Sequence, residues 1–255
     1  MERLPAVAGW QWIKQGFALF RRQPVEMSTL FVLYFFVNGL LSLVPFIGPI
    51  LHFILVPTFS MAFMHACANI EQGRRVYPKV LFAGFRSPAF KSLLILGVLY
   101  LLAPVLAVLA TALVDNGAFW QAINSPAAPD SKTVEDSSLV LSTFIAAAVY
   151  LSISLLLWYA APLIAWQNMS VGKAIFFSFF AVTRAIKAFF VYLLAWLTIA
   201  MFLIFTVSSL LKLLIDNTEA FMLLPFAILM MVVVQCSFYP SYTQVFGIPQ
   251  LPEEA

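Results

Sequence analysis

Long apolar segments without charged residues alternate with short basic segments along the chain. Lys, Arg, Asp and Glu are absent from residues 27–70, 92–114, 137–172, 188–211 and 220–252. A helix needs about 20 apolar residues to cross a bilayer. The first segment has 44 residues, which is enough for two helices joined by a turn at Pro45–Pro49. The pattern therefore predicts six transmembrane helices, over residues 27–45, 49–70, 90–113, 138–164, 187–211 and 220–242.

The composition agrees with this membrane assignment. Hydrophobic residues make up 63% of the chain, charged residues make up 10%, and the mean hydropathy is +0.97. Soluble domains are about half apolar and about a quarter charged, so a large soluble core does not account for this chain. We expect an all-α, polytopic membrane helical bundle that forms a single integral membrane domain over residues 1–255.

The basic residues predict the orientation of the bundle. Twelve of the 14 Lys and Arg residues precede the first predicted span or lie between the second and third spans or the fourth and fifth. These positions share one side of the membrane, which the positive-inside bias makes the cytoplasmic side. Both termini are then cytoplasmic, including a tail at residues 243–255. The loop at residues 115–136, with four acidic residues and only Lys132, is extracytoplasmic.

Three similar units are predicted along the chain, over residues 7–70, 74–167 and 168–245. Each unit begins with a basic segment that we expect to form a helix at the membrane interface, and a pair of spans follows it. Since each unit starts and ends on the same side, the copies would be related by an axis along the membrane normal.

The interfacial helices have recognisable signals. In the first, an apolar face is formed by residues three and four apart, namely Trp10, Ile13, Phe17 and Phe20. In the second, Pro78 suits the first helical turn. In the third, Ser170 is the expected N-cap.

A proline lies toward the cytoplasmic end of each even-numbered span. These residues are Pro57, Pro162 and Pro240. Proline removes a backbone hydrogen bond and bends a helix, a cost that neighbouring helices can absorb in a membrane. We expect kinks at these three positions, which would be candidate gates if the protein is a transporter.

The opening of the chain resembles a known family. Gly9-Trp10-Gln11-Trp12-Ile13-Lys14-Gln15-Gly16-Phe17 is followed by Leu19-Phe20-Arg21-Arg22-Gln23-Pro24. This GWxWxxxG…LFRRxP pattern is similar to that of an uncharacterised family of six-helix inner-membrane proteins from proteobacteria. The resemblance implies a location in the bacterial inner membrane. It implies no activity and no site residues.

Catalytic and metal-binding patterns are absent from the sequence. The predicted span cores contain no charged residue, and there is no metalloprotease, hydrolase or phosphate-loop motif. His52 and His65 are about 20 Å apart along one helix, too far to share a metal ion. Cys67 and Cys236 are expected to be small buried residues without a disulfide, because they lie toward the cytoplasm. We therefore predict no catalytic residue, metal or cofactor.

Uncharged polar residues in the spans allow two interpretations. They could pack between helices or line a passage. The residues concerned are Asn38, Ser42, Ser60, Tyr150, Ser152, Ser154, Thr206, Ser208, Ser209 and Gln235. Packing between helices is the favoured interpretation.

These observations favour a non-enzymatic scaffold that organises lipid or a partner membrane protein at the cytoplasmic face. The expected ligands are membrane lipids, including anionic ones, and nucleic acid is not expected because topology already explains the basic residues. The candidate lipid-contact residues are Trp10, Trp12, Phe17, Arg21 and Arg22. The alternative is a transporter or channel for an apolar or amphipathic small molecule.

Overall fold

The computed structural model of the protein describes residues 4–124, 137–214 and 219–249, and within these ranges every regular element is a helix. In chain order the elements are α1 (Val7–Arg22), α2 (Pro24–Ser42), α3 (Ile47–Glu71), the 3-10 helix η1 (Pro78–Phe82), α4 (Ala83–Arg86), α5 (Phe90–Asp115), α6 (Ala118–Asn124), α8 (Ser137–Leu157), α9 (Ala160–Gln167), α10 (Val171–Arg184), α11 (Ile186–Leu214) and α12 (Glu219–Phe246).

Within the described ranges, six helical stretches are long and apolar enough to cross a membrane, which confirms the predicted number. They cover Pro24–Ser42, Ile47–Glu71, Phe90–Asp115, Leu139–Gln167, Ile186–Ser209 and Pro225–Phe246. The turn predicted around Pro45 joins α2 to α3. It brings the two helices so close that a Cβ atom at Gly48 would lie 2.1 Å from the carbonyl oxygen of Leu41.

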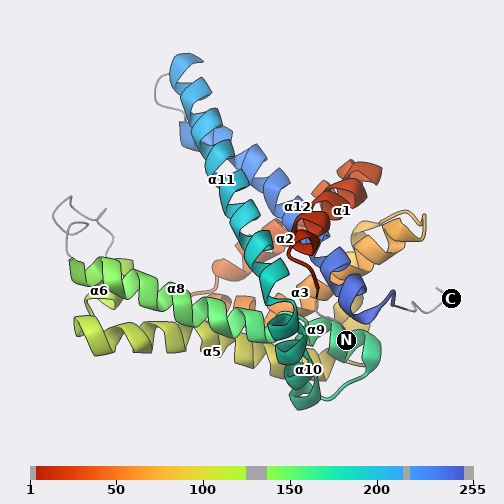
Figure 1. Ribbon diagram of the computed structural model, residues 1–255, viewed down its shortest axis with the longest axis horizontal. Helices are drawn as coiled ribbons and strands as arrows, with labels where there is room; N and C mark the ends of the chain where they lie inside the picture. Colours follow the sequence, from red (N-terminus) through yellow and green to blue (C-terminus); the bar gives the residue numbers. More distant parts are fainter. Residues whose placement is uncertain (1–3, 125–136, 215–218, 250–255) are drawn as a thin grey trace.

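Helical hairpins diverge from a shared central region. Figure 1 shows this for the α5–α8 pair and the α11–α12 pair, and α2–α3 forms another hairpin. Helix α3 contacts α5, α9 and α12 and therefore lies at the centre. Its buried residues concentrate between Pro57 and Ile70, and those of α12 between Val232 and Tyr242. Elsewhere the hairpins expose large apolar side chains, as is typical of a surface that faces lipid.

The segments that precede the three hairpins pack at one end of the bundle, which we call the basic end. Here η1 and α4 contact α3, α10 contacts α8 and α9, and α1 contacts α11 and α12. Each segment thus packs on the hairpin of the preceding predicted unit, and α1 completes the series by packing on the last hairpin (Figure 1). A cyclic arrangement of three repeats would produce this order of contacts. The repeats at residues 7–70, 74–167 and 168–245 stay a prediction.

The fourth span differs from the predicted continuous helix at residues 138–164. Helix α8 ends at Leu157 and α9 begins at Ala160, so a two-residue break at Trp158 and Tyr159 divides the span. The backbone N–H of Tyr159, which the break leaves without a helical acceptor, donates to Ser178 Oγ of α10 at 3.0 Å. A residue from another element therefore stabilises the break.

The observed boundaries of three other segments differ from the predicted ones. The second interfacial segment is a 3-10 helix followed by one α-helical turn, because Pro78 and Pro88 limit regular hydrogen bonding at its two ends. Helix α12 continues to Phe246, so the expected tail at residues 243–255 begins inside a helix. The expected loop at residues 115–136 contains α6, and its residues 125–136 lie outside the described part of the chain.

Candidate functional site

Two glycines of the opening motif bring α1 against the last hairpin. A Cβ atom at Gly9 would lie 2.1 Å from the carbonyl oxygen of Ala188 in α11. A Cβ atom at Gly16 would lie 2.5 Å from the Cα atom of Ser237 in α12. Small residues allow this close approach of helix backbones in membrane proteins. The spacing of the motif therefore matches two neighbouring helices, one for each glycine.

Trp12 lies between these glycines and is fully buried. Its ring makes edge-to-face contacts with Phe189 at 5.3 Å and Tyr192 at 5.8 Å, and its Nε1–H donates to Gln244 Oε1. The prediction that Trp12 contacts the lipid surface is therefore wrong. Helix α1 buries Ile13 and Leu19 as well as Trp12 and its small residues, whereas Trp10 and Phe17 of the predicted apolar face are exposed.

That other face of α1 forms one wall of an apolar groove of about 430 Å³. Trp10 and Phe17, exposed by 43% and 48%, line the groove from α1. Apolar residues of α11 and α12, including Trp196 and Leu229, form the opposite walls. Lys14 is the one charged residue among those that line it. The groove can accept an apolar chain, with a cation beside it.

The two arginines of the motif have different neighbours. The guanidinium carbon of Arg21 lies 5.9 Å from the centre of the Phe17 ring, beside the groove. Arg22 instead lines a polar recess of about 400 Å³ between α1, α3 and α12. In this recess the hydroxyl of Tyr239 donates to the carboxylate of Glu71. The five predicted lipid-contact residues are therefore divided among the groove, the recess and the protein core.

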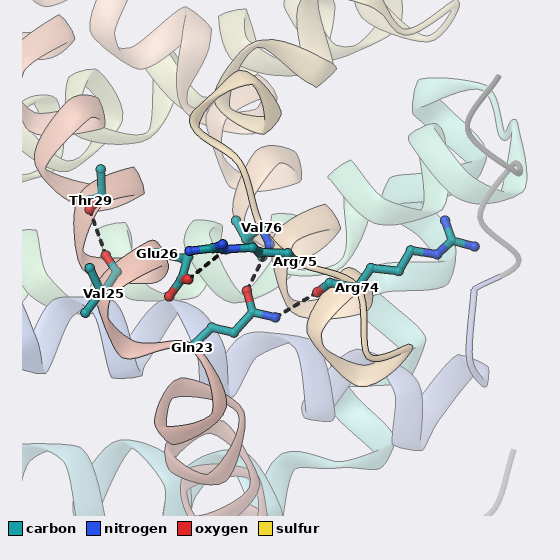
Figure 2. Close-up of polar contacts among 7 residues, drawn as sticks. All are labelled: Gln23, Val25, Glu26, Thr29, Arg74, Arg75 and Val76. Atoms are coloured by element: carbon teal, nitrogen blue, oxygen red, sulfur yellow. Dashed lines mark hydrogen bonds and ion pairs between the residues drawn. The ribbon is translucent and has the colours of Figure 1, made fainter.

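Gln23, between α1 and α2, connects this region to the loop that follows α3 (Figure 2). Its Nε2–H donates to the carbonyl oxygen of Arg74 at 2.7 Å, and its Oε1 accepts the N–H of Val76 at 2.9 Å. Nearby, Arg75 and Glu26 form an ion pair at 3.2 Å. Gln23 has no recognisable signal in the sequence, because its partners are backbone groups 51 and 53 residues away.

The three prolines lie in different helical settings. Pro57 and Pro240 are inside the continuous helices α3 and α12, whereas Pro162 is in the first turn of α9, after the break. All three are at the basic end, where neighbouring segments pack against the same helices. Their role as gates stays a prediction.

A cavity of about 280 Å³ lies where the three hairpins meet. Eight of its lining residues are aromatic, and none is charged. Several lining side chains can form hydrogen bonds, and they come from three helices and from the α8–α9 break. They include Ser60, Tyr150, Ser154, Trp158 and Gln235. The Nε1–H of Trp158 is buried and has no acceptor among the described residues.

Seven of the ten uncharged polar residues named from the sequence fall into two groups. Asn38, Ser42 and Ser152 donate to backbone carbonyls three or four residues earlier in their own helices. By contrast, Ser60, Tyr150, Ser154 and Gln235 line the central cavity. The hydrogen bonds of the first subset lie within single helices and do not test packing between helices, so both interpretations stay predictions.

The histidines and cysteines have local partners. His52 Nδ1 is hydrogen bonded to Asn38 Oδ1, and the His65 ring lies 5.5 Å from that of Trp166. Cys67 and Cys236 are free and buried, and they lie close to each other. Across residues 4–124, 137–214 and 219–249, no group of three His, Cys, Asp or Glu side chains is placed to hold a metal ion.

One known protein is similar over almost the entire chain. It is the probable inner membrane protein of Burkholderia thailandensis, which is 35% identical over 260 residues, covering 97% of this chain and 96% of the relative. No protein-family model and no solved structure matches this chain. The similarity extends over the whole membrane domain and is not limited to the opening motif.

Proposed function

This chain belongs to the family of the probable inner membrane protein of Burkholderia thailandensis, and we propose that it organises lipid, without catalysis, at the cytoplasmic face of the inner membrane. The observation that carries the proposal is the apolar groove between α1 and the α11–α12 hairpin. Lys14 lines this groove and Arg21 lies beside it, so an acyl chain and an anionic headgroup could be held together.

The aromatic residues of α1 support the same role. Trp10 and Phe17 are large, partly exposed rings at the predicted interface, where tryptophan in particular is enriched in membrane proteins. On α10, a second predicted interfacial helix, four partly exposed phenylalanines form a further apolar surface: Phe176, Phe177, Phe179 and Phe180. In the second segment Phe82 is also exposed, so all three predicted interfacial segments have aromatic groups that could contact lipid.

A lipid-retention experiment tests the groove. The protein is reconstituted in nanodiscs that contain equal amounts of phosphatidylglycerol and phosphatidylethanolamine, and retained lipids are identified by native mass spectrometry. A basic side chain near an anionic surface contributes about 1 kcal/mol. Loss of two such groups, in a Lys14→Gln/Arg21→Gln variant, should therefore lower the preference for phosphatidylglycerol by about thirtyfold at most.

The matched control is Lys91→Gln/Lys173→Gln, which removes two exposed basic residues away from the groove. We expect this variant to retain most of the preference. An equal loss in both variants would indicate a general charge effect and would contradict a site at α1. A scaffold for a protein partner is tested separately, by native mass spectrometry of the protein released from native-membrane nanodiscs, where a second polypeptide in fixed ratio would support it.

The second candidate function is a transporter or channel for an apolar or amphipathic small molecule. The observation that favours it is the central cavity, to which all three hairpins contribute. Transporter sites commonly lie where repeated units meet near the middle of the membrane. Flux of an uncharged fluorescent solute into proteoliposomes, compared with liposomes without protein, tests this function directly.

A further inference from the structure

We propose that the central cavity is a binding site for a small, uncharged, flat molecule that carries a carbonyl oxygen. This inference is independent of lipid binding at α1. It concerns a different site, and it requires binding alone rather than transport. No Asp, Glu, Lys, Arg or His lines the cavity. An ionic ligand placed there would lose its hydration without gaining a partner, so a neutral ligand is favoured.

The polar groups around the cavity favour a ligand that accepts hydrogen bonds. The side chains of Ser60, Ser154 and Gln235 line the cavity, make no hydrogen bond to other described residues, and can each donate to a ligand oxygen. The Nε1–H of Trp158 also lacks an acceptor among the described residues, but it is enclosed by protein atoms and is not open to the cavity. The serines and the glutamine therefore carry this part of the inference.

The aromatic walls favour a flat ligand. The Trp158 ring is held by edge-to-face contacts with Phe189, Tyr192 and Phe238 at 5.4, 6.1 and 5.5 Å, so its position is fixed by packing. Tyr34 contacts Phe59 and Phe63 in the same manner on the opposing helices α2 and α3. A planar ring system can make further contacts of this kind with the rings that line the cavity.

The volume and surroundings limit the ligand further. A cavity of about 280 Å³ is at the lower end of the range for small-molecule sites and does not accommodate a whole phospholipid. Tyr150 is 46% exposed, so the wall formed by α8 can be reached from outside the bundle. A ligand dissolved in the bilayer could therefore enter between the diverging hairpins without crossing the basic end.

Benzophenone is a suitable probe, because it is an uncharged aromatic ketone that forms covalent bonds with nearby C–H groups under near-ultraviolet light. The protein in nanodiscs is illuminated at increasing probe concentrations, and the modified residues are located by peptide mass spectrometry. We expect saturable labelling of peptides from α3, α8 and α12 that contain cavity-lining residues. Labelling of lipid-facing peptides should increase in proportion to probe concentration.

A pair of serine variants on α8 provides the comparison. Ser154 lines the cavity, whereas Ser152 is exposed and its hydroxyl donates to the Ala148 carbonyl. Ser154→Leu should lower saturable labelling by about fivefold or more, because the added bulk fills the site. Ser152→Leu should leave it unchanged. Ser60→Ala should raise the half-saturating concentration by about three- to tenfold through loss of a donor.

The proposal is overturned if labelling of the cavity peptides is not saturable, or if the two serine variants behave alike. Either result would mean that the cavity holds only water or lipid tails. If Ser154→Leu does not fold, Gln235→Leu replaces it as the cavity-filling variant. Retained phosphatidylglycerol is measured on the same samples, so a failure of this site can be told apart from a failure of the lipid site at α1.

Discussion

Replacing Gly16 with alanine tests how α1 is held against the bundle. The new Cβ atom would lie 2.5 Å from the Cα, 2.6 Å from the backbone nitrogen and 2.7 Å from the Cβ of Ser237. Distances under 3.0 Å are essentially never observed for a Cβ atom, and ordinary contact begins at 3.4 Å. Since two of the opposing atoms are backbone, a side-chain rotation cannot remove the clash. Helix α1 must move away from α12 by about 0.9 Å, the difference between 2.5 and 3.4 Å.

The cost follows from that displacement. Forcing extra volume into a packed contact costs about 1–3 kcal/mol. A gap of this size also removes a quarter to a half of the dispersion attraction across it, and Trp12 lies in the affected contact. Alanine regains about 0.5–1 kcal/mol over glycine within a helix. We therefore expect Gly16→Ala to lower the free energy of unfolding by about 1–2 kcal/mol.

Gly39→Ala is the matched control, because Gly39 lies within α2 and a Cβ atom there would have no neighbour within 4 Å. This variant should be unchanged or more stable by up to about 1 kcal/mol. Both are compared by denaturant unfolding in mixed micelles, followed by tryptophan fluorescence. If Gly16→Ala is as stable as Gly39→Ala, the close contact between α1 and α12 is refuted.

Four further predictions concern the connections at the basic end and the orientation. Gln23→Ala should lower the free energy of unfolding by about 1–2 kcal/mol, because it removes two hydrogen bonds to backbone groups. Glu26→Gln should cost less than about 1 kcal/mol, since its arginine partner is 70% exposed. Ser178→Ala should cost about 1–3 kcal/mol by leaving a buried backbone N–H unsatisfied. Thr183→Ala, which loses bonds only within its own helix, serves as the control in the same unfolding assay. A reporter fused within residues 125–136 should report an extracytoplasmic location, and a cytoplasmic signal would overturn the predicted orientation.

The six spans could be predicted because the membrane imposes a simple requirement on the sequence. A spanning helix must be long, apolar and free of uncompensated charge, and the charge-free segments satisfy this directly. The break after Leu157 was not predictable in the same way. Its stability depends on the Ser178 hydroxyl, which reaches the backbone of Tyr159 only after α10 has packed against the end of α8. Local composition does not encode that contact.

The buried face of α1 shows a second limit of sequence patterns. In water, the most apolar face of a helix predicts the side that packs on the protein. At a membrane both lipid and protein accept apolar side chains, so hydrophobicity does not distinguish them. Trp10 and Phe17 face the groove, whereas Gly9 and Gly16 allow the closest packing. The glycine spacing was visible in the motif, and it was the better signal.

The apolar groove and the central cavity share the helices of the last hairpin. On α12, Val233 lines the groove, and the next two residues, Val234 and Gln235, line the cavity. On α11, Trp196 lines the groove and Tyr192 lines the cavity, with their rings 6.4 Å apart. Because packed side chains transmit displacement rather than absorb it, a shift of α12 changes the walls of both spaces. Binding at one site must then alter affinity at the other whenever the two ligands favour different positions of α12. The contacts of Gly9 with α11 and of Gly16 with α12 restrict those positions. The opening motif therefore influences the shape of both the groove and the cavity.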